Sequence, residues 1–257
     1  MDIEEIFQKA KEGDEDSLLK LKTLAEEAQK FVNIFHQLEN ENQEISSESQ
    51  DVKKVYYDGK KEHAVGTIYL REGITEIKDF EFKCCNKLEK VILPESVTSI
   101  GNGAFSHCYS LKEIKFPESL TAIGYRAFSG CSSLKEIKLP DSLTSTGNGT
   151  FNNCSSLTEI KFPESLTSIG NLAFAFCYRL TEINLPESLT EIGWDAFKHC
   201  IRLTEIKFPK NLKSIGEEAF LDCDSLKKIT YYESTEKILK ECFKDKWYYL
   251  EKIVIDE

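Results

Sequence analysis

Seven cysteines recur at a fixed spacing, and their thiols are the groups in this sequence best suited to bind metal or to form disulfides. A histidine precedes two of them, in His107-Cys108 and His199-Cys200, which sets two ligands that zinc prefers side by side. Neighbouring side chains point apart, however, and the two pairs lie four repeats from each other, so we expect no metal site. The column consists of Cys85, Cys108, Cys131, Cys154, Cys177, Cys200 and Cys223, each 23 residues after the last.

The constant spacing favours a structural role for these thiols. It puts one cysteine at the same point of every repeat, where a small and weakly polar side chain fits a packed interior. Adjacent column cysteines in stacked repeats lie within the reach of a disulfide. Because the total of nine cysteines is odd and the chain is long for a disulfide framework, we expect reduced thiols. Cys84 and Cys242 lie off the column and are expected to be the more reactive.

No other catalytic arrangement can be assembled from the sequence. The two Gly-Asn-Gly motifs, at Gly101 and Gly147, lack the lysine and hydroxyl of a nucleotide-binding loop. His36 lies in a predicted helix, His63 lies before the first rung, and the other two histidines lie on repeat turns, so no Ser-His-Asp or Cys-His set can form. We therefore predict no catalytic residues, no cofactor and no metal, and a protein that is not an enzyme.

The 23-residue period also defines the elements that carry the cysteines. The spacing L-x-x-I-x-F, as in Leu111, Ile114 and Phe116, predicts a short strand with one buried side, and the proline that follows ends it. One repeat cannot bury its apolar side alone, but stacked copies form a continuous core. The prolines of the chain all keep the period: Pro94, Pro117, Pro140, Pro163, Pro186 and Pro209.

These repeats divide the chain into three predicted parts. Residues 54–257 are expected to form a solenoid of about nine rungs, and the rungs at 65–70 and 250–255 depart from the consensus as end caps do. Residues 1–40 carry apolar side chains at helical spacing and predict an acidic helical hairpin. Residues 41–53 are polar and predict a linker.

The repeat reads much like P-x-S-[VL]-T-x-I-G-x-x-A-F-x-x-C-x-x-L and resembles the BspA-like, or Treponema-type, leucine-rich repeats over about residues 62–257. The resemblance implies a leucine-rich-repeat solenoid with a parallel inner β-sheet and an irregular outer side of short strands, here preceded by an α-helical hairpin. That hairpin weakly resembles a Sel1 or tetratricopeptide repeat. The family resemblance also implies protein recognition, often by surface adhesins of host-associated microbes.

Charge and hydropathy limit the partners of the chain. The net charge is −11, and the first 50 residues hold 13 acidic and 5 basic side chains, so phosphate-rich partners such as nucleic acid are disfavoured. No apolar run approaches the ~20 residues of a membrane span, so no membrane insertion is expected. The opening MDIEEIFQKAKEGDEDS is acidic where a signal peptide is basic, which predicts a cytoplasmic location, with the cell surface as the alternative.

Two surfaces are candidates for binding a protein partner. On the inner sheet, charged residues two apart form parallel columns, for which a solvated ladder of ion pairs is the favoured interpretation and a binding face the alternative. These columns are Glu113, Glu136, Glu159, Glu182 and Glu205 beside Lys115, Lys138, Lys161 and Lys207.

The second candidate is an aromatic cluster on the outer side. It comprises Phe176, Tyr178, Trp194 and Ile201, at positions where other repeats carry Asn, Gly or Ser. We expect a protein partner or a second copy of the chain to dock here, with Trp194 as its anchor. The alternative is that these side chains fold down over the edge of the core.

Two further predictions concern the ends and the middle of the solenoid. Tyr69 and Ile92 are expected to pack against the hairpin. Thr146 and Thr150 replace apolar residues of other repeats, which predicts the weakest coil there. The function expected for the whole chain is a non-enzymatic protein-protein interaction module. A surface adhesin, or a regulatory or docking subunit of an enzyme complex, is the alternative.

Overall fold

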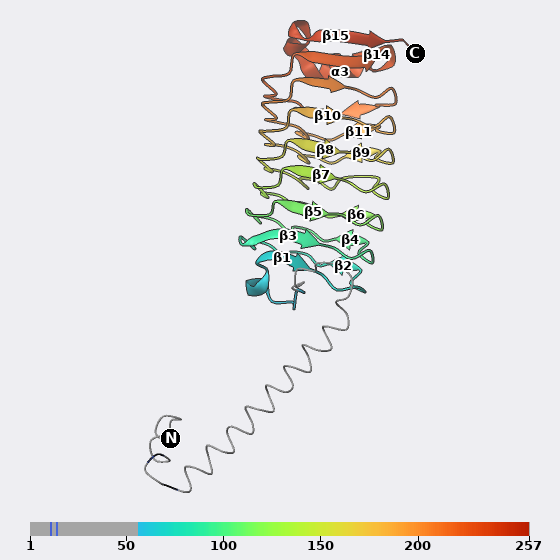
Figure 1. Cartoon of the computed structure of the whole chain (residues 1–257). Coiled ribbons are helices and arrows are strands. Elements are labelled where there is room, and N and C mark those ends of the chain that lie inside the picture. The colour runs from blue at the N-terminus through green and yellow to red at the C-terminus, as the bar shows by residue number, and fades with distance from the viewer. Residues whose placement is uncertain (1–10, 12–13, 15–55, 257) are drawn as a thin grey trace, which may run out of the picture. The chain divides into compact units, whose positions relative to one another are not determined.

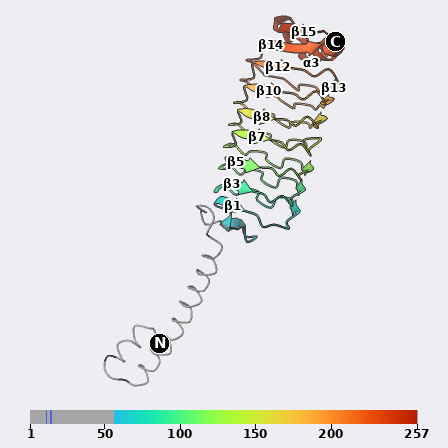
Figure 2. The same ribbon diagram turned by 45° about the vertical axis from the view of Figure 1, so that its right-hand side comes forward.

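The computed structural model describes residues 11, 14 and 56–256, and from Tyr56 onward the chain winds into a stack of coils (Figure 1). The chain divides into two units, and the coils belong to the second, Lys54–Glu257. The predicted hairpin at 1–40 and linker at 41–53 lie outside the described residues, apart from Lys11 and Asp14. The solenoid itself is confirmed, with parallel strands along one side of the stack that form sheets of three, two and four strands (Figure 2).

Each coil contributes one short strand to the inner side, and every pairing between these strands is parallel. Partners in the central coils are 23 residues apart, as in Ile183 and Ile206, because each residue lies over its equivalent in the next coil. The middle residue of each three-residue strand is buried and its neighbours are exposed. The inner strands are β1 (Gly66–Tyr69), β3 (Leu88–Ile92), β5 (Glu113–Lys115), β7 (Glu136–Lys138), β8 (Glu159–Lys161), β10 (Glu182–Asn184), β12 (Glu205–Lys207), β14 (Lys228–Tyr232) and β15 (Glu251–Ile255).

A second wall of two-residue strands follows the turn after the proline. It is split into two three-stranded sheets, and the coil between them offers only the bridge from Ser145 to Ser168. That coil contains Thr146, so the ladder is interrupted where the sequence departs from its consensus. The strands are β2 (Glu76–Ile77), β4 (Ser99–Ile100), β6 (Ala122–Ile123), β9 (Ser168–Ile169), β11 (Glu191–Ile192) and β13 (Ser214–Ile215).

The third side of each coil is a turn-rich stretch that we call the outer segment, residues 171–177 and their equivalents. Its alternate N–H groups donate to carbonyls of the next coil, from Phe174 to Ala196 at 2.8 Å and from Phe176 to Lys198 at 2.7 Å. The backbone is therefore paired between coils although the segment is not a regular strand. This arrangement is the irregular outer side that the sequence predicts.

The interior is organised around a file of phenylalanine rings, one from each outer segment. Rings of successive coils stack with centroids 5.0–5.7 Å apart, from Phe82 to Phe243. Offset stacking of this kind adds to the apolar area that the rings bury. At the first coil Tyr57 packs on Phe82 at 4.6 Å, and burial there raises the pKa of Tyr57 to about 12.

The last coil has a different construction. After β14 the chain forms η2 (Glu233–Thr235), α3 (Glu236–Phe243) and η3 (Lys244–Tyr249) before returning to the inner sheet as β15. α3 packs against β13 and supplies Phe243, which lies 23 residues after Phe220 and continues the file of rings. A helix thus stands where a further short strand and outer segment would otherwise be. At the other end of the stack, η1 (Lys61–His63) precedes β1.

Candidate functional site

The column cysteines are buried, and six of them make the same contact. Each of these six Sγ atoms donates to the carbonyl of a phenylalanine 26 residues earlier, at 2.9–3.5 Å, as from Cys131 to Phe105. Burial raises the pKa of the Cys108 thiol to about 12 and that of Cys131 well above its usual value. The column therefore carries neutral thiols that satisfy buried carbonyls, a role that sequence reasoning about small apolar residues did not include.

The described residues contain neither a disulfide nor a group of metal ligands at these thiols. All nine cysteines lie there, and none is in a disulfide. No group of three or more metal-ligating side chains gathers among the described residues. Cys84 is exposed, whereas Cys242, predicted to be reactive, is half-buried and has its pKa raised to about 12 by burial.

The charged columns of the inner sheet lie exposed on the surface. Their ion pairs are few and do not follow one pattern. Lys161 Nζ lies 3.1 Å from Oε1 of Glu159 on the same strand, whereas Glu113 Oε1 lies 2.7 Å from Nζ of Lys90 in the preceding coil. Asn184 donates to Glu182 at 3.0 Å. Exposed pairs of this kind contribute ~1 kcal/mol or less to stability. Shallow grooves of about 330 and 440 Å³ run across this face.

The aromatic side chains predicted as a docking site flank the column cysteines on the outer side. The rings of Phe176 and Tyr178 meet edge to face at 6.2 Å, and Phe176 also stacks on His199 of the next coil at 4.8 Å. Tyr178 and Ile201 are each 38% exposed, and Phe176 is half-buried. We call Phe176, Tyr178, His199 and Ile201 the aromatic edge.

Local backbone geometry explains how Phe176 comes to the surface. The residue before each column cysteine has a left-handed backbone, with φ between 57° and 79°, which turns the chain from the outer segment towards the inner strand. Gly130 and Asn153 adopt this conformation readily, but for a bulky residue it costs ~1–2 kcal/mol. Phe176, at φ 62°, therefore bears the conformational cost of a turn that every coil makes, and it is the largest apolar side chain at this position.

Trp194 lies at the other end of the outer segment. Its carbonyl accepts from the N–H of Leu172, whereas the carbonyl of Lys198, four residues further on, accepts from Phe176. The Trp194 N–H donates to the Asn171 side chain at 2.9 Å, and the side chain is 64% exposed. In the described part of the chain no ring contact joins Trp194 to the aromatic edge. Trp194 is thus exposed but stands apart from the rings with which the sequence grouped it.

Sequence reasoning missed two partners of this surface. His199 was considered only as a metal ligand or a catalytic residue, yet its ring stacks on Phe176 and its Nδ1 lies 3.4 Å from the carboxylate of Asp222. His107 and Tyr109 form a second pair three coils earlier, with rings 5.7 Å apart. His199, His107 and Tyr109 are each next to a column cysteine in the sequence. An alignment of the repeats by that cysteine could therefore have found them.

The residues predicted to pack against the hairpin lie on the first inner strands. Tyr69 and Ile92 are half-buried neighbours in β1 and β3, and the ring of Tyr56 lies 6.2 Å from that of Tyr69. Their predicted partner lies outside the described residues, so this packing remains a prediction.

The stacked coils, the parallel inner sheet and the repeated leucines define a leucine-rich-repeat solenoid. Residues 75–202 and 147–257 match the BspA type Leucine rich repeat region, and the chain belongs to that family. The chain is 31% identical to a leucine rich repeat protein of T. pallidum, over 68% of this chain and 80% of that chain, with a TM-score of 0.59. The resemblance drawn from the repeat is therefore confirmed.

Two more distant solved structures are also similar. A leucine-rich repeat protein from Bacteroides ovatus shares 22% identity over 81% of this chain and 77% of its own, with a TM-score of 0.46. A leucine rich cell surface protein from Faecalibacterium prausnitzii shares 19% identity over 75% and 79%, with a TM-score of 0.41. No curated protein is significantly similar to the chain. No helix in the described residues is long and apolar enough to cross a membrane.

Proposed function

We propose that this protein is a non-enzymatic protein-binding module and that the aromatic edge is its docking surface. The observation that carries the proposal is Phe176, a large apolar residue held half-exposed on a left-handed backbone. The equivalent residues of the other coils are smaller or more polar, namely Cys84, His107, Gly130, Asn153, His199 and Asp222. Backbone strain of this kind clusters at functional sites. Exposed aromatic side chains are also the residues that most often dominate protein interfaces.

The side chains of the aromatic edge indicate what kind of surface it would bind. Tyr178 and Ile201 offer an apolar surface beside the imidazole of His199, which suits a protein surface with an apolar centre and a polar rim. The partner is either a different protein or a second copy of this chain. Trp194, more exposed than either of those side chains, supplies a second anchor at the far end of the outer segment.

A pair of matched double variants tests the proposal. Phe176→Ala with Tyr178→Ala should weaken binding of the native partner, or self-association in sedimentation, about thirtyfold, which corresponds to ~2 kcal/mol. The control is His107→Ala with Tyr109→Ala, which removes an aromatic pair from the same positions three coils away. The control should bind as the unchanged protein does.

The melting curve separates the alternatives. If the first double variant unfolds the protein, these residues belong to the core and the proposal is wrong. If both double variants stay folded and keep full binding, the docking surface lies elsewhere. In that case Glu159→Ala with Lys161→Ala would test the inner sheet in the same assay.

A further inference from the structure

The last outer segment of the solenoid carries a row of backbone N–H donors that have no acceptor among the described residues. In the coil before it, three alternate N–H groups bind carbonyls of the next coil at 2.8–3.0 Å. These donors belong to Asp195, Phe197 and His199, and their acceptors to Glu217, Ala219 and Leu221. The corresponding N–H groups of Glu218, Phe220 and Asp222 make no hydrogen bond in the described part of the chain. We call these three groups the donor row.

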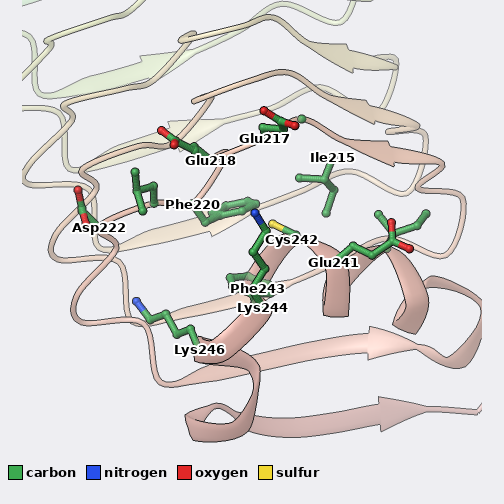
Figure 3. Close-up of a pocket in the computed structure, with 13 residues that line it drawn as sticks. Ile215, Glu217, Glu218, Phe220, Asp222, Glu241, Cys242, Phe243, Lys244 and Lys246 are labelled. Carbon is green, nitrogen blue, oxygen red and sulfur yellow. The ribbon is translucent and has the colours of Figure 1, made fainter.

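The three residues that carry the donor row are among those that line a groove of about 530 Å³ between the last outer segment and α3 (Figure 3). α3 closes the interior beside it, since Phe243 stacks on Phe220 at 5.7 Å. α3 covers the apolar ring, but among the described residues none of its carbonyls accepts a hydrogen bond from the donor row. Leu221, 40% exposed, adds an apolar patch to the lining.

The charges around the groove are mainly acidic. Glu217, Asp222 and Glu241 line it with exposed carboxylates. Glu218 is paired with Lys198, and of the two lysines of the lining Lys246 donates to the carbonyl of Cys223. The lining thus carries four carboxylates and two lysines, and the Asp222 carboxylate also lies 3.4 Å from the Nδ1 of His199.

We propose that this groove binds an extended segment of a partner protein that carries basic side chains. Three donors on alternate residues match the alternate carbonyls of an extended chain, and every preceding coil already makes this contact with the next. The acidic lining selects basic over acidic side chains by charge complementarity. The site adjoins the aromatic edge, since Asp222 lies 3.4 Å from the Nδ1 of His199, but none of its lining residues belongs to that edge. The variants that test the two proposals change different residues, so either proposal can fail without the other.

Amide exchange in the full chain, followed by NMR, tests the donor row directly. In the free protein the amides of Glu218, Phe220 and Asp222 should exchange faster than those of Asp195, Phe197 and His199, which are hydrogen-bonded. Adding the peptide acetyl-KVKVKVK-amide should slow the first set and leave the second unchanged. The peptide acetyl-EVEVEVE-amide, equally prone to the extended conformation, should have no effect.

A charge reversal gives an independent measurement. Glu217→Lys with Glu241→Lys should weaken binding of the basic peptide about tenfold in fluorescence anisotropy. Glu136→Lys with Glu159→Lys makes the same change of charge on the inner sheet and should leave the affinity within about twofold.

Four results would overturn the proposal. The first is slow exchange of the donor row in the free protein, because it would mean that the row is already paired. The second is binding of both peptides with equal affinity. The third is absence of binding by the basic peptide, and the fourth is protection confined to the amides of β15, which would place the peptide on that edge strand instead.

Discussion

The inner sheet and the outer segments of this solenoid differ in how closely each coil copies the one before it. Four of the inner strands read Glu-Ile-Lys and a fifth reads Glu-Ile-Asn, whereas the positions beside the column cysteines range from Gly130 to Phe176. Both sides are held by backbone hydrogen bonds between coils, which place no demand on exposed side chains. A coil can therefore change the side chains of its outer surface without losing its place in the stack. We expect the residues that bind a partner to lie where the repeats differ from one another.

The sharpest form of this contrast lies within one outer segment. Phe174 and Phe176 are two residues apart, but Phe174 is fully buried in the file of rings and Phe176 is half-exposed. Phe174→Ala should lower the free energy of unfolding by ~3–5 kcal/mol, because it leaves a cavity between two stacked rings. Phe176→Ala should lower it by less than ~1 kcal/mol. Urea denaturation of both variants measures the difference, and equal losses would place Phe176 in the core.

The buried thiols should make the outer side sensitive to alkaline pH. Burial raises the pKa of Cys108, Cys177 and Cys223 from 9.0 to about 12, so these groups stay neutral in the folded chain and ionise in the unfolded one. Their contribution to the free energy of unfolding is complete below pH 9 and is lost as the pH rises towards 12. Each such thiol shifts the unfolding equilibrium about tenfold per pH unit within that window.

Urea midpoints measured from pH 8 to 11 test this dependence. Replacing one thiol, in Cys177→Ala, should lower stability at pH 8 but reduce the slope of stability against pH. A slope equal to that of the unchanged protein would mean that the Cys177 thiol ionises equally in both states.

The coil with Thr146 provides a smaller test, because the second wall is interrupted there. Both of its threonine hydroxyls are buried but bonded, since Thr146 Oγ1 accepts from the Gly170 N–H at 3.0 Å and Thr150 donates to the Gly147 carbonyl at 2.7 Å. In Thr146→Ile the Gly170 N–H can turn to the backbone carbonyl, as Gly193 does with Ile169 at 2.8 Å. We expect a gain of ~1 kcal/mol in the free energy of unfolding from the added apolar burial. A lower urea midpoint would show that the hydroxyl contact outweighs that burial.

The smallest effect is expected on the inner sheet. Glu159 and Lys161 are 3.1 Å apart on an exposed face, and their removal in Glu159→Ala with Lys161→Ala should change stability by less than ~0.5 kcal/mol. Thermal melts at low and high salt measure this pair. A loss above ~1 kcal/mol that high salt abolishes would make the charged columns a stabilising network and would narrow the contrast between the two sides.

The sequence by itself was enough to predict the solenoid, because a strict period of 23 requires that equivalent residues stack. It placed the buried isoleucines, phenylalanines and cysteines correctly, since each apolar column can be buried only by its own copies. For Tyr178, Trp194 and Ile201 the pattern left open whether they are exposed or cover the edge of the core, and the structure shows them exposed.

Other features depended on how the coil folds in three dimensions. The path of the outer segment decides which residues of the next coil lie beside Phe176. Its N–H donates to the carbonyl of Lys198, four residues after Trp194, and its ring stacks on His199 instead of Trp194. The replacement of a final outer segment by α3 decides that Phe243 completes the file of rings. It also leaves the N–H groups of Glu218, Phe220 and Asp222 without acceptors among the described residues. A period states which residues are equivalent, but backbone direction and the end of the stack decide which groups meet and which remain available to a partner.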